Sequence, residues 1–167
     1  MANGPEVGST APDFSLPGLR LDGAEAVRGT YALSAERGHP VVLAFYPGDE
    51  SAVCTKQMCS YSSGLEEFTD LGATVWGISP QNLDSHEKFA RKHGLRLPLL
   101  ADVDSAAVEA YGIGLGGGLR RAVFIVDAEG VIRYRHVALV GLTFRSTDTL
   151  KRELEALKTE RPSRPRR

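Results

Sequence analysis

The chain has 167 residues, which is the length of one domain able to bury a sizeable core. Its hydrophobic fraction of 42% and charged fraction of 25% exclude the collagen-like, wholly disordered and disulfide-scaffold classes. The formal net charge of −1 gives no reason to expect a nucleic-acid partner, and the longest apolar run, Val41 to Tyr46, is too short for a membrane span. Because the first residues show neither a basic nor an apolar leader, we expect a cytoplasmic protein.

The first predicted element is a small β-hairpin, in which two short apolar stretches, 13–16 and 19–21, flank the turn signal Pro17-Gly18. A continuous apolar run over 41–46 then predicts a buried central strand. The elements predicted after it, in chain order, are a helix over 51–71, a strand over 73–79, a helix over 83–93, a strand over 97–101, a short helix over 105–111, two strands over 121–127 and 131–137, and a helix over 146–158.

This order predicts a mixed central sheet with helices on both faces and an N-terminal β-hairpin. It is compatible with a thioredoxin-like fold, although periodicity alone does not choose that fold over other α/β arrangements. A glycine-rich stretch over 112–118 lacks the Gly-Lys-Ser/Thr ending of a phosphate loop and precedes a strand, so we interpret it as a flexible connector.

The last ten residues hold five Lys or Arg against one Glu and are broken by two prolines. No aromatic side chain is interleaved with these charges, so the composition is typical of a solvated terminus rather than a nucleic-acid contact. We therefore predict one domain over residues 1–160 and a basic flexible tail over residues 161–167.

The two cysteines, Cys54 and Cys59, lie five residues apart near the start of the helix predicted over 51–71. A single close pair in a chain of this size indicates chemistry rather than a disulfide framework. At about 100° per residue, Cys54 shares a stripe with Met58 and Tyr61, which predicts a buried sulfur in the first turn, whereas Cys59 faces elsewhere. First-turn N–H groups and the helix dipole favour an anion at Cys54, and Ser51 is placed to cap the helix.

Helix geometry limits how the two sulfurs can pair. In an intact helix the Cα atoms of residues i and i+5 are about 8.6 Å apart, whereas a disulfide needs about 7 Å or less. A disulfide between Cys54 and Cys59 therefore requires the first turns to unwind, and Gly64 inside the predicted helix lowers the helix stability slightly. The alternative interpretation of Cys54 is an inert buried hydrophobe.

The pattern Pro47-x-x-x-Ser51-x-x-Cys54 resembles the active-site signature of the peroxiredoxins. A second cysteine five residues later resembles their Q-type subfamily, also called bacterioferritin comigratory protein. The resemblance covers nearly the whole chain, through the stretches 11–14, 72–79, 85–89, 97–102 and 121–127.

The resemblance implies a thiol-dependent peroxidase that reduces hydrogen peroxide or organic hydroperoxides. Cys54 would be the peroxidatic nucleophile, which attacks the O–O bond and becomes a sulfenic acid. Ser51 would bind the peroxide oxygens, and Pro47 would shield the sulfur from bulk water. Arg121 would hold the thiolate and the charge that develops on the oxygens, with Arg120 as the fallback.

The resemblance further implies that Cys59 is the resolving cysteine. It would close an intramolecular disulfide that thioredoxin or a similar dithiol protein reduces. Because both cysteines belong to one chain, a monomer is expected. Neither a cofactor, a metal, a nucleic acid nor a membrane is expected as a partner.

The sequence departs from the family pattern in three places, the first of which is Ser51 in place of Thr, a change that the signature allows. Ala52-Val53 stands where Pro-Gly is common, and Gln57 stands where Glu is common, which removes a negative charge one turn from the sulfur. Three alternatives to the two-cysteine peroxidase remain open. They are a one-cysteine peroxiredoxin in which Cys59 is incidental, a metal-binding or copper-chaperone protein of the same fold, and a non-catalytic binding module. His86 and His93, seven residues apart, are interpreted as an ordinary helix face rather than metal ligands.

Overall fold

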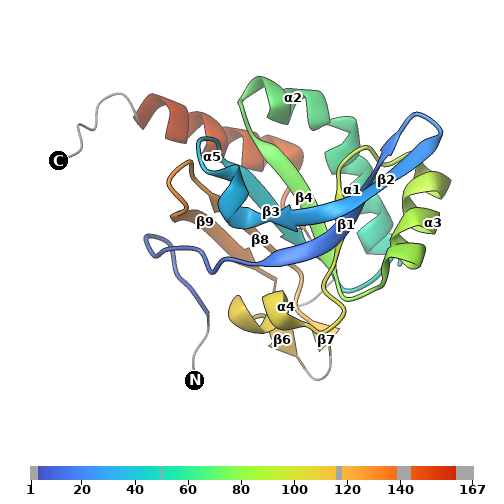
Figure 1. Cartoon of the computed structure of the whole chain (residues 1–167). Coiled ribbons are helices and arrows are strands. Elements are labelled where there is room, and N and C mark those ends of the chain that lie inside the picture. The colour runs from blue at the N-terminus through green and yellow to red at the C-terminus, as the bar shows by residue number, and fades with distance from the viewer. Residues whose placement is uncertain (1–3, 50, 116–117, 139–143, 161–167) are drawn as a thin grey trace.

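A computed structural model describes residues 4–49, 51–115, 118–138 and 144–160. Its centre is a mixed seven-stranded sheet in the order β2-β1-β5-β4-β3-β8-β9, in which β3–β4 and β4–β5 are parallel and the other pairs antiparallel (Figure 1). The strands of this sheet are β1 (Ser15–Asp22), β2 (Glu25–Ala32), β3 (Val41–Phe45), β4 (Thr74–Ser79), β5 (Leu99–Ala101), β8 (Ala122–Val126) and β9 (Ile132–Val137).

Helices cover both faces of the sheet, as the sequence pattern predicts. One buried cluster joins the sheet to α1, α2, α3 and α5, and a second cluster on the opposite face includes η1 and α4. These elements are η1 (Leu33–Glu36), α1 (Ala52–Ser63), α2 (Leu65–Asp70), α3 (Leu83–His93), α4 (Ala106–Ala110) and α5 (Thr147–Glu160).

The central strand β3 is buried on both faces because its side chains alternate between the two clusters. Val42 and Ala44 belong to the cluster of α1, whereas Val41, Leu43 and Phe45 belong to the cluster of α4. All five are at most 1% exposed. The continuous apolar run therefore corresponds to a strand with a core on each side.

The N-terminal hairpin is present, but the prediction of its turn at Pro17-Gly18 was wrong. Strand β1 runs through both residues, and the turn lies at Gly23-Ala24, where Asp22 pairs with Glu25 and Gly23 has a φ of +63°. Gly18 lies inside the strand and leaves room for the Tyr31 ring. A Cβ at this position would come within 2.8 Å of that ring.

The single helix predicted over 51–71 is two helices, separated at Gly64. The N–H of Gly64 donates to the carbonyl of Ser60 and ends α1. A Cβ at Gly64 would lie 2.8 Å from Cγ2 of Thr147, so the glycine lets the first turn of α5 approach this junction. Gly72, at a φ of +75°, follows α2 at the predicted stop.

The other predicted elements are confirmed, with most ends within one or two residues. The glycine-rich stretch differs, because part of it pairs as a small ribbon of β6 (Gly114–Leu115) and β7 (Gly118–Leu119). The tail predicted over residues 161–167 lies outside the described residues. Within the described part of the chain, no helix is both long and apolar enough to cross a membrane.

Candidate active site

The first turn of α1 holds Cys54 directly after the central strand. Ser51 is the N-cap residue, as predicted, and its Oγ accepts the N–H of Cys54 at 3.2 Å. The Cys54 side chain is fully buried, in the cluster that also contains Met58 and Tyr61. The helical spacing therefore gave the correct face for this sulfur.

Arg121 reaches the sulfur from a segment 67 residues away along the chain. It directly precedes β8, whose first residue, Ala122, pairs with Phe45 at the end of β3. This register places Arg121 beside the loop that leads into α1. The guanidinium is buried, and its Nη2 donates to Sγ of Cys54 at 3.2 Å. A cation in contact with the sulfur stabilises a thiolate there.

Gln57 binds the other arm of the same guanidinium. Arg121 Nη1 donates to Oε1 of Gln57 at 2.6 Å, and Nε2 of Gln57 donates to the Tyr61 hydroxyl at 3.3 Å. The Tyr61 hydroxyl donates in turn to the carbonyl of Arg145 at 2.6 Å. Burial raises the pKa of Tyr61 to about 12, so its hydroxyl keeps the proton that it donates.

The sequence marks Gln57 only as a departure from a family pattern, and its contact with Arg121 was not predicted. The available signal was the spacing of three residues from Cys54, which places both side chains on one face of a helix. Gln57 is fully buried, although glutamine is usually exposed. A buried amide group needs hydrogen-bond partners, which here are Arg121 and Tyr61.

Cys59 lies near the end of the same helix and is partly buried at the edge of the core cluster. Burial raises the pKa of its thiol. Both thiols are free, and α1 is continuous from Ala52 to Ser63. This is the folded, reduced arrangement, from which pairing of the two sulfurs requires backbone movement.

The two remaining candidate residues lie at the margin of the site. Pro47 is exposed in the loop that follows β3. Arg120 is partly exposed, and its backbone N–H donates to the carbonyl of Ile113 at 2.8 Å. Of the two adjacent arginines, Arg121 is the one whose guanidinium contacts Cys54.

The histidines predicted as an ordinary helix face are in different surroundings. His86 is fully buried and contacts Asp49, whereas His93 is partly exposed and packs edge-on against Phe89. Asp49, two residues before Ser51, was missed by sequence analysis. No group of three or more side chains suited to a metal ion occurs among the described residues.

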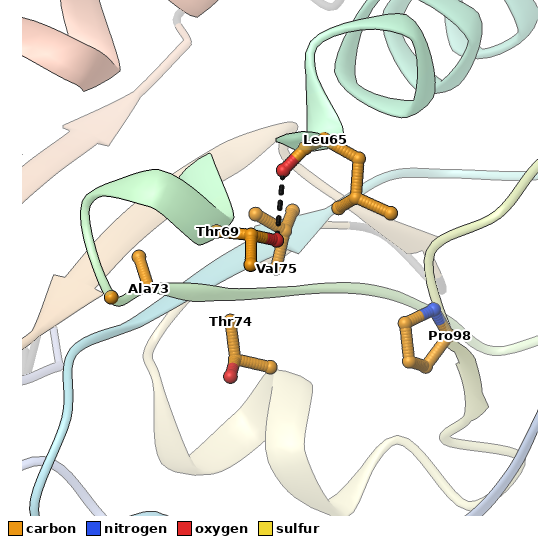
Figure 2. Close-up of a pocket in the computed structure, with 7 residues that line it drawn as sticks. Leu65, Thr69, Ala73, Thr74, Val75 and Pro98 are labelled. Carbon is orange, nitrogen blue, oxygen red and sulfur yellow. Dashed lines mark hydrogen bonds between the residues drawn. The ribbon is translucent and has the colours of Figure 1, made fainter. Parts of the chain in front are cut away.

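An open pocket of about 320 Å³ lies away from this site, between α2 and the start of β4. Figure 2 shows its lining, in which Thr69 Oγ1 donates to the carbonyl of Leu65 at 3.0 Å. The pocket carries no titratable side chain, since it is lined by Leu65, Thr69, Gly72, Ala73, Thr74, Val75 and Pro98. It contributes nothing to the chemistry at Cys54.

Comparison with known proteins decides the family. The model of the AhpC/TSA family matches residues 7–135. Peroxiredoxin Bcp of Bacillus subtilis is 33% identical over 156 residues, which cover 87% of this chain and 95% of the relative. The chain belongs to the AhpC/TSA family, on its peroxiredoxin Q and Bcp branch. Peroxiredoxin Q, chloroplastic, of Oryza sativa subsp. japonica is 38% identical over 130 residues, and the match spans 76% of this chain but only 57% of the rice protein.

Solved structures of other peroxiredoxins confirm the fold. Mycobacterium bovis AhpC superposes with a TM-score of 0.85 at 24% identity, over 99% of this chain and all of its own. The reduced 2-Cys peroxiredoxin of Plasmodium vivax gives a TM-score of 0.85 at 22% identity, over 94% of this chain and 84% of its own. The prediction of a thioredoxin-like α/β fold is therefore confirmed.

Gln57 provides Arg121 with an uncharged hydrogen-bond acceptor in this peroxiredoxin. Its amide oxygen accepts from Arg121 without carrying a negative charge, so the guanidinium keeps its full positive charge beside Cys54. A carboxylate at this place would neutralise part of that charge. The departure from the family pattern thus leaves Arg121 with a neutral acceptor at this position.

Proposed function

We propose that the chain is a thiol-dependent peroxidase that reduces hydrogen peroxide or organic hydroperoxides through Cys54. The observation that carries this proposal is the contact between the buried Cys54 sulfur and the Arg121 guanidinium at 3.2 Å, at the capped first turn of α1. A buried thiol that meets both a helix N-terminus and a cation has the surroundings of a reactive cysteine, not of an inert one.

The peroxide step is a two-electron oxidation of Cys54. Its thiolate attacks one peroxide oxygen, the O–O bond breaks, and the sulfur becomes a sulfenic acid while the second oxygen leaves as water or an alcohol after taking a proton. Negative charge shifts from sulfur to the oxygens in this step. The guanidinium of Arg121 and the hydroxyl of Ser51 supply donors for it, and the role proposed for Pro47 is to shield the sulfur from bulk water.

Resolution forms a disulfide between Cys54 and Cys59. The Cys59 thiolate attacks the oxidised sulfur, an S–S bond forms, and the sulfenic oxygen leaves as water. Since both cysteines lie on one continuous helix, the first turns of α1 must unwind. Thioredoxin or a similar dithiol protein then returns both thiols to the reduced state.

One alternative keeps the peroxide step and omits resolution by Cys59. The observation behind it is that α1 is intact and holds the two thiols apart in the reduced protein. In a one-cysteine enzyme the sulfenic acid would be reduced directly by an external thiol. Replacement of Cys59 by serine would then leave turnover with a dithiol reductant unchanged.

We also expect a cytoplasmic monomer that acts without a cofactor. The intramolecular pair of cysteines supports the monomer, because resolution needs no second chain. The rice relative is named chloroplastic, so the compartment is a separate prediction for this chain. Analytical ultracentrifugation of the reduced and oxidised protein tests the oligomeric state.

The intact mass of the reduced protein after one equivalent of hydrogen peroxide tests the proposal. A loss of about two mass units indicates the intramolecular disulfide, whereas a gain of about 16 or 32 indicates a sulfenic or sulfinic acid and favours the one-cysteine alternative. The Cys54→Ser variant is the control and should show no change. If the unmodified chain also shows no change, neither thiol is activated and the peroxidase proposal fails.

A further inference from the structure

A buried pair formed by Asp49 and His86 lies outside the contacts of Cys54 and Arg121. The two side chains are 2% and 0% exposed, and Nδ1 of His86 is 2.7 Å from Oδ2 of Asp49. Asp49 belongs to the loop between β3 and α1, whereas His86 belongs to α3, 37 residues later. The pair therefore joins the loop that precedes Cys54 to a different helix.

The hydrogen bonds of His86 fix the number of protons that the pair holds. Nε2 is 2.9 Å from the carbonyl oxygen of Leu100, and a carbonyl accepts only, so Nε2 carries a proton. Nδ1 faces the carboxyl group of Asp49, which places a second acceptor against the ring. A neutral imidazole would put a lone pair against a carboxylate there. The contact is favourable only if one further proton lies between the two groups.

The surroundings of Asp49 place that proton on the histidine. Besides His86, the carboxylate accepts the hydroxyls of Tyr46 and Ser85, each at 2.7 Å. Burial, followed by the charge of Asp49, raises the pKa of Tyr46 well above its usual value, so this hydroxyl donates. These two hydroxyl donors favour the ionised carboxylate. The pair is thus an imidazolium and a carboxylate that neutralise each other.

The same residues hold the loop in place. The backbone N–H of Asp49 donates to Oε1 of Gln81, and the Gln81 side chain lies against Gly48. The side chain of Asp49 therefore fixes the loop to α3, and the backbone N–H of Asp49 fixes it to Gln81, which precedes α3. Asp49 stands two residues before the N-cap Ser51, so this anchor sets where the first turn of α1 begins.

Tyr46 connects the anchor to the sulfur. Its ring packs in the same buried cluster as Cys54, and its hydroxyl donates to Asp49. A shift of the loop would move Tyr46, the Ser51 cap and Cys54 together. The Arg121 guanidinium, which comes from the other side through β8, would then no longer meet the sulfur at hydrogen-bonding distance.

We propose that Asp49 and His86 are positioning residues for the peroxide reaction, and that their hydrogen-bonded contact anchors the loop of Ser51 to α3 so that Cys54 meets Arg121. This inference rests on the proposed peroxidase function. Because Asp49 precedes α1, the anchor also remains outside the turns that unwind when Cys54 and Cys59 pair.

Nitrogen NMR of the histidine side chains tests the ion pair without any use of peroxide. In the reduced protein at neutral pH, His86 should show protons on both ring nitrogens. Asp49→Asn should convert it to a neutral ring with a proton on Nε2 only, since the amide NH₂ can donate to an unprotonated Nδ1. A neutral His86 in the unmodified protein would overturn the ion pair.

Stopped-flow measurement of the second-order rate constant with hydrogen peroxide tests the positioning role. Asp49→Ala should lower it by about tenfold or more, because a small misplacement of reacting groups slows a reaction strongly. Asp49→Asn keeps the shape and can keep the contact with His86 if the Ser85 hydroxyl turns to accept from the amide, so it should stay within about threefold of the unmodified protein. A slow, folded Asp49→Asn protein, or a fast Asp49→Ala protein, would overturn the proposal.

A matched pair of histidine variants covers the case in which Asp49→Ala does not fold. His86→Gln loses one of the two donors, whereas His93→Gln changes the other histidine of α3, outside the pair. The first should slow the peroxide step and the second should not, and equal rates would contradict the inference. If the unmodified chain does not react with peroxide at all, the proposed function fails, and the NMR result still decides the ion pair.

Discussion

Arg121 donates to Oε1 of Gln57 at 2.6 Å, and Gln57 lies one turn after Cys54 on the same helix. Helix α1 therefore supplies both the sulfur that the guanidinium contacts and the acceptor that aims the guanidinium at it. Unwinding of the turns between Cys54 and Cys59 would remove both contacts together. In the proposed cycle, the arginine charge would thus act on the sulfur during the peroxide step and be withdrawn during resolution.

Arg121→Ala should lower the rate constant with hydrogen peroxide by about 10²–10³-fold, the usual effect of removing a donor that stabilises developing oxygen charge. Arg120→Ala is the matched control, because it removes the adjacent guanidinium and leaves the contact of Arg121 Nη2 with Cys54 Sγ in place. Stopped-flow kinetics of the two reduced variants provide the comparison. Equal rates for Arg121→Ala and the unmodified chain, with a slow Arg120→Ala, would transfer the role to Arg120.

Gln57→Glu should slow the peroxide step by about tenfold, since a carboxylate beside Arg121 neutralises part of the charge that favours the thiolate. It should also slow disulfide formation, because unwinding would then separate an ion pair. Stopped-flow kinetics with hydrogen peroxide in the Cys59→Ser background measure the first effect. An unchanged rate constant would contradict it.

Gln57→Leu tests the same contact through stability. It removes the acceptor of a charged donor at a fully buried position, and such a hydrogen bond contributes about 1.5–3 kcal/mol. The free energy of unfolding in urea should fall by about that amount. Thr69→Leu, on the exposed face of α2, is the control and should change the stability little.

Ser51→Ala should lower the free energy of unfolding by about 1 kcal/mol, because the first turn of α1 loses its cap. Ser51→Thr keeps an oxygen on Cβ and should restore most of this stability together with the rate of the peroxide step. Urea unfolding and stopped-flow kinetics on the three proteins give the two readouts. If Ser51→Ala loses stability and keeps its full rate, the hydroxyl acts as a cap alone.

Much of this architecture follows from local patterns in the sequence. The apolar run at Val41–Phe45, the capping Ser51 and the periodic stripe through Cys54 each act over a few residues, and the structure has the predicted element in each case. The hairpin turn was misplaced because Pro17-Gly18 carries the local signal of a turn, whereas the decisive contact at Gly18 is the Tyr31 ring, which lies 13 residues away.

The part of the site that sequence analysis missed consists of contacts between distant segments. Gln57 meets Arg121 across 64 residues, and Asp49 meets His86 across 37. Nothing in the local pattern around either residue indicates its partner, because these pairings depend on the order of strands in the sheet. What the sequence offers for Gln57 is its spacing of three residues from Cys54, which predicts a polar side chain on the buried face that needs a partner but does not name that partner.

Cys59 should need a higher pH for alkylation in the folded protein than a free cysteine does. Burial raises the pKa of its thiol, so the thiolate that reacts with iodoacetamide is scarcer at any pH near neutrality. In the Cys54→Ser variant, the pH at which the alkylation rate is half-maximal should lie above the free-cysteine value of about 8.5. In denaturant this pH should return to the free-cysteine value. A midpoint at or below the free-cysteine value in the folded protein would contradict the effect of burial.

The same shift sets the sign of a stability change at alkaline pH. Because the folded chain keeps the Cys59 proton to a higher pH than the unfolded chain does, the free energy of unfolding should fall as the pH rises above the unfolded pKa, and the fall should end above the folded pKa. Urea unfolding of Cys54→Ser at several pH values, compared with the variant that lacks both thiols, isolates this contribution. Parallel pH profiles for the two proteins would show that Cys59 titrates alike in the folded and unfolded chains. Unwinding of α1 would then not change how readily this thiol loses its proton.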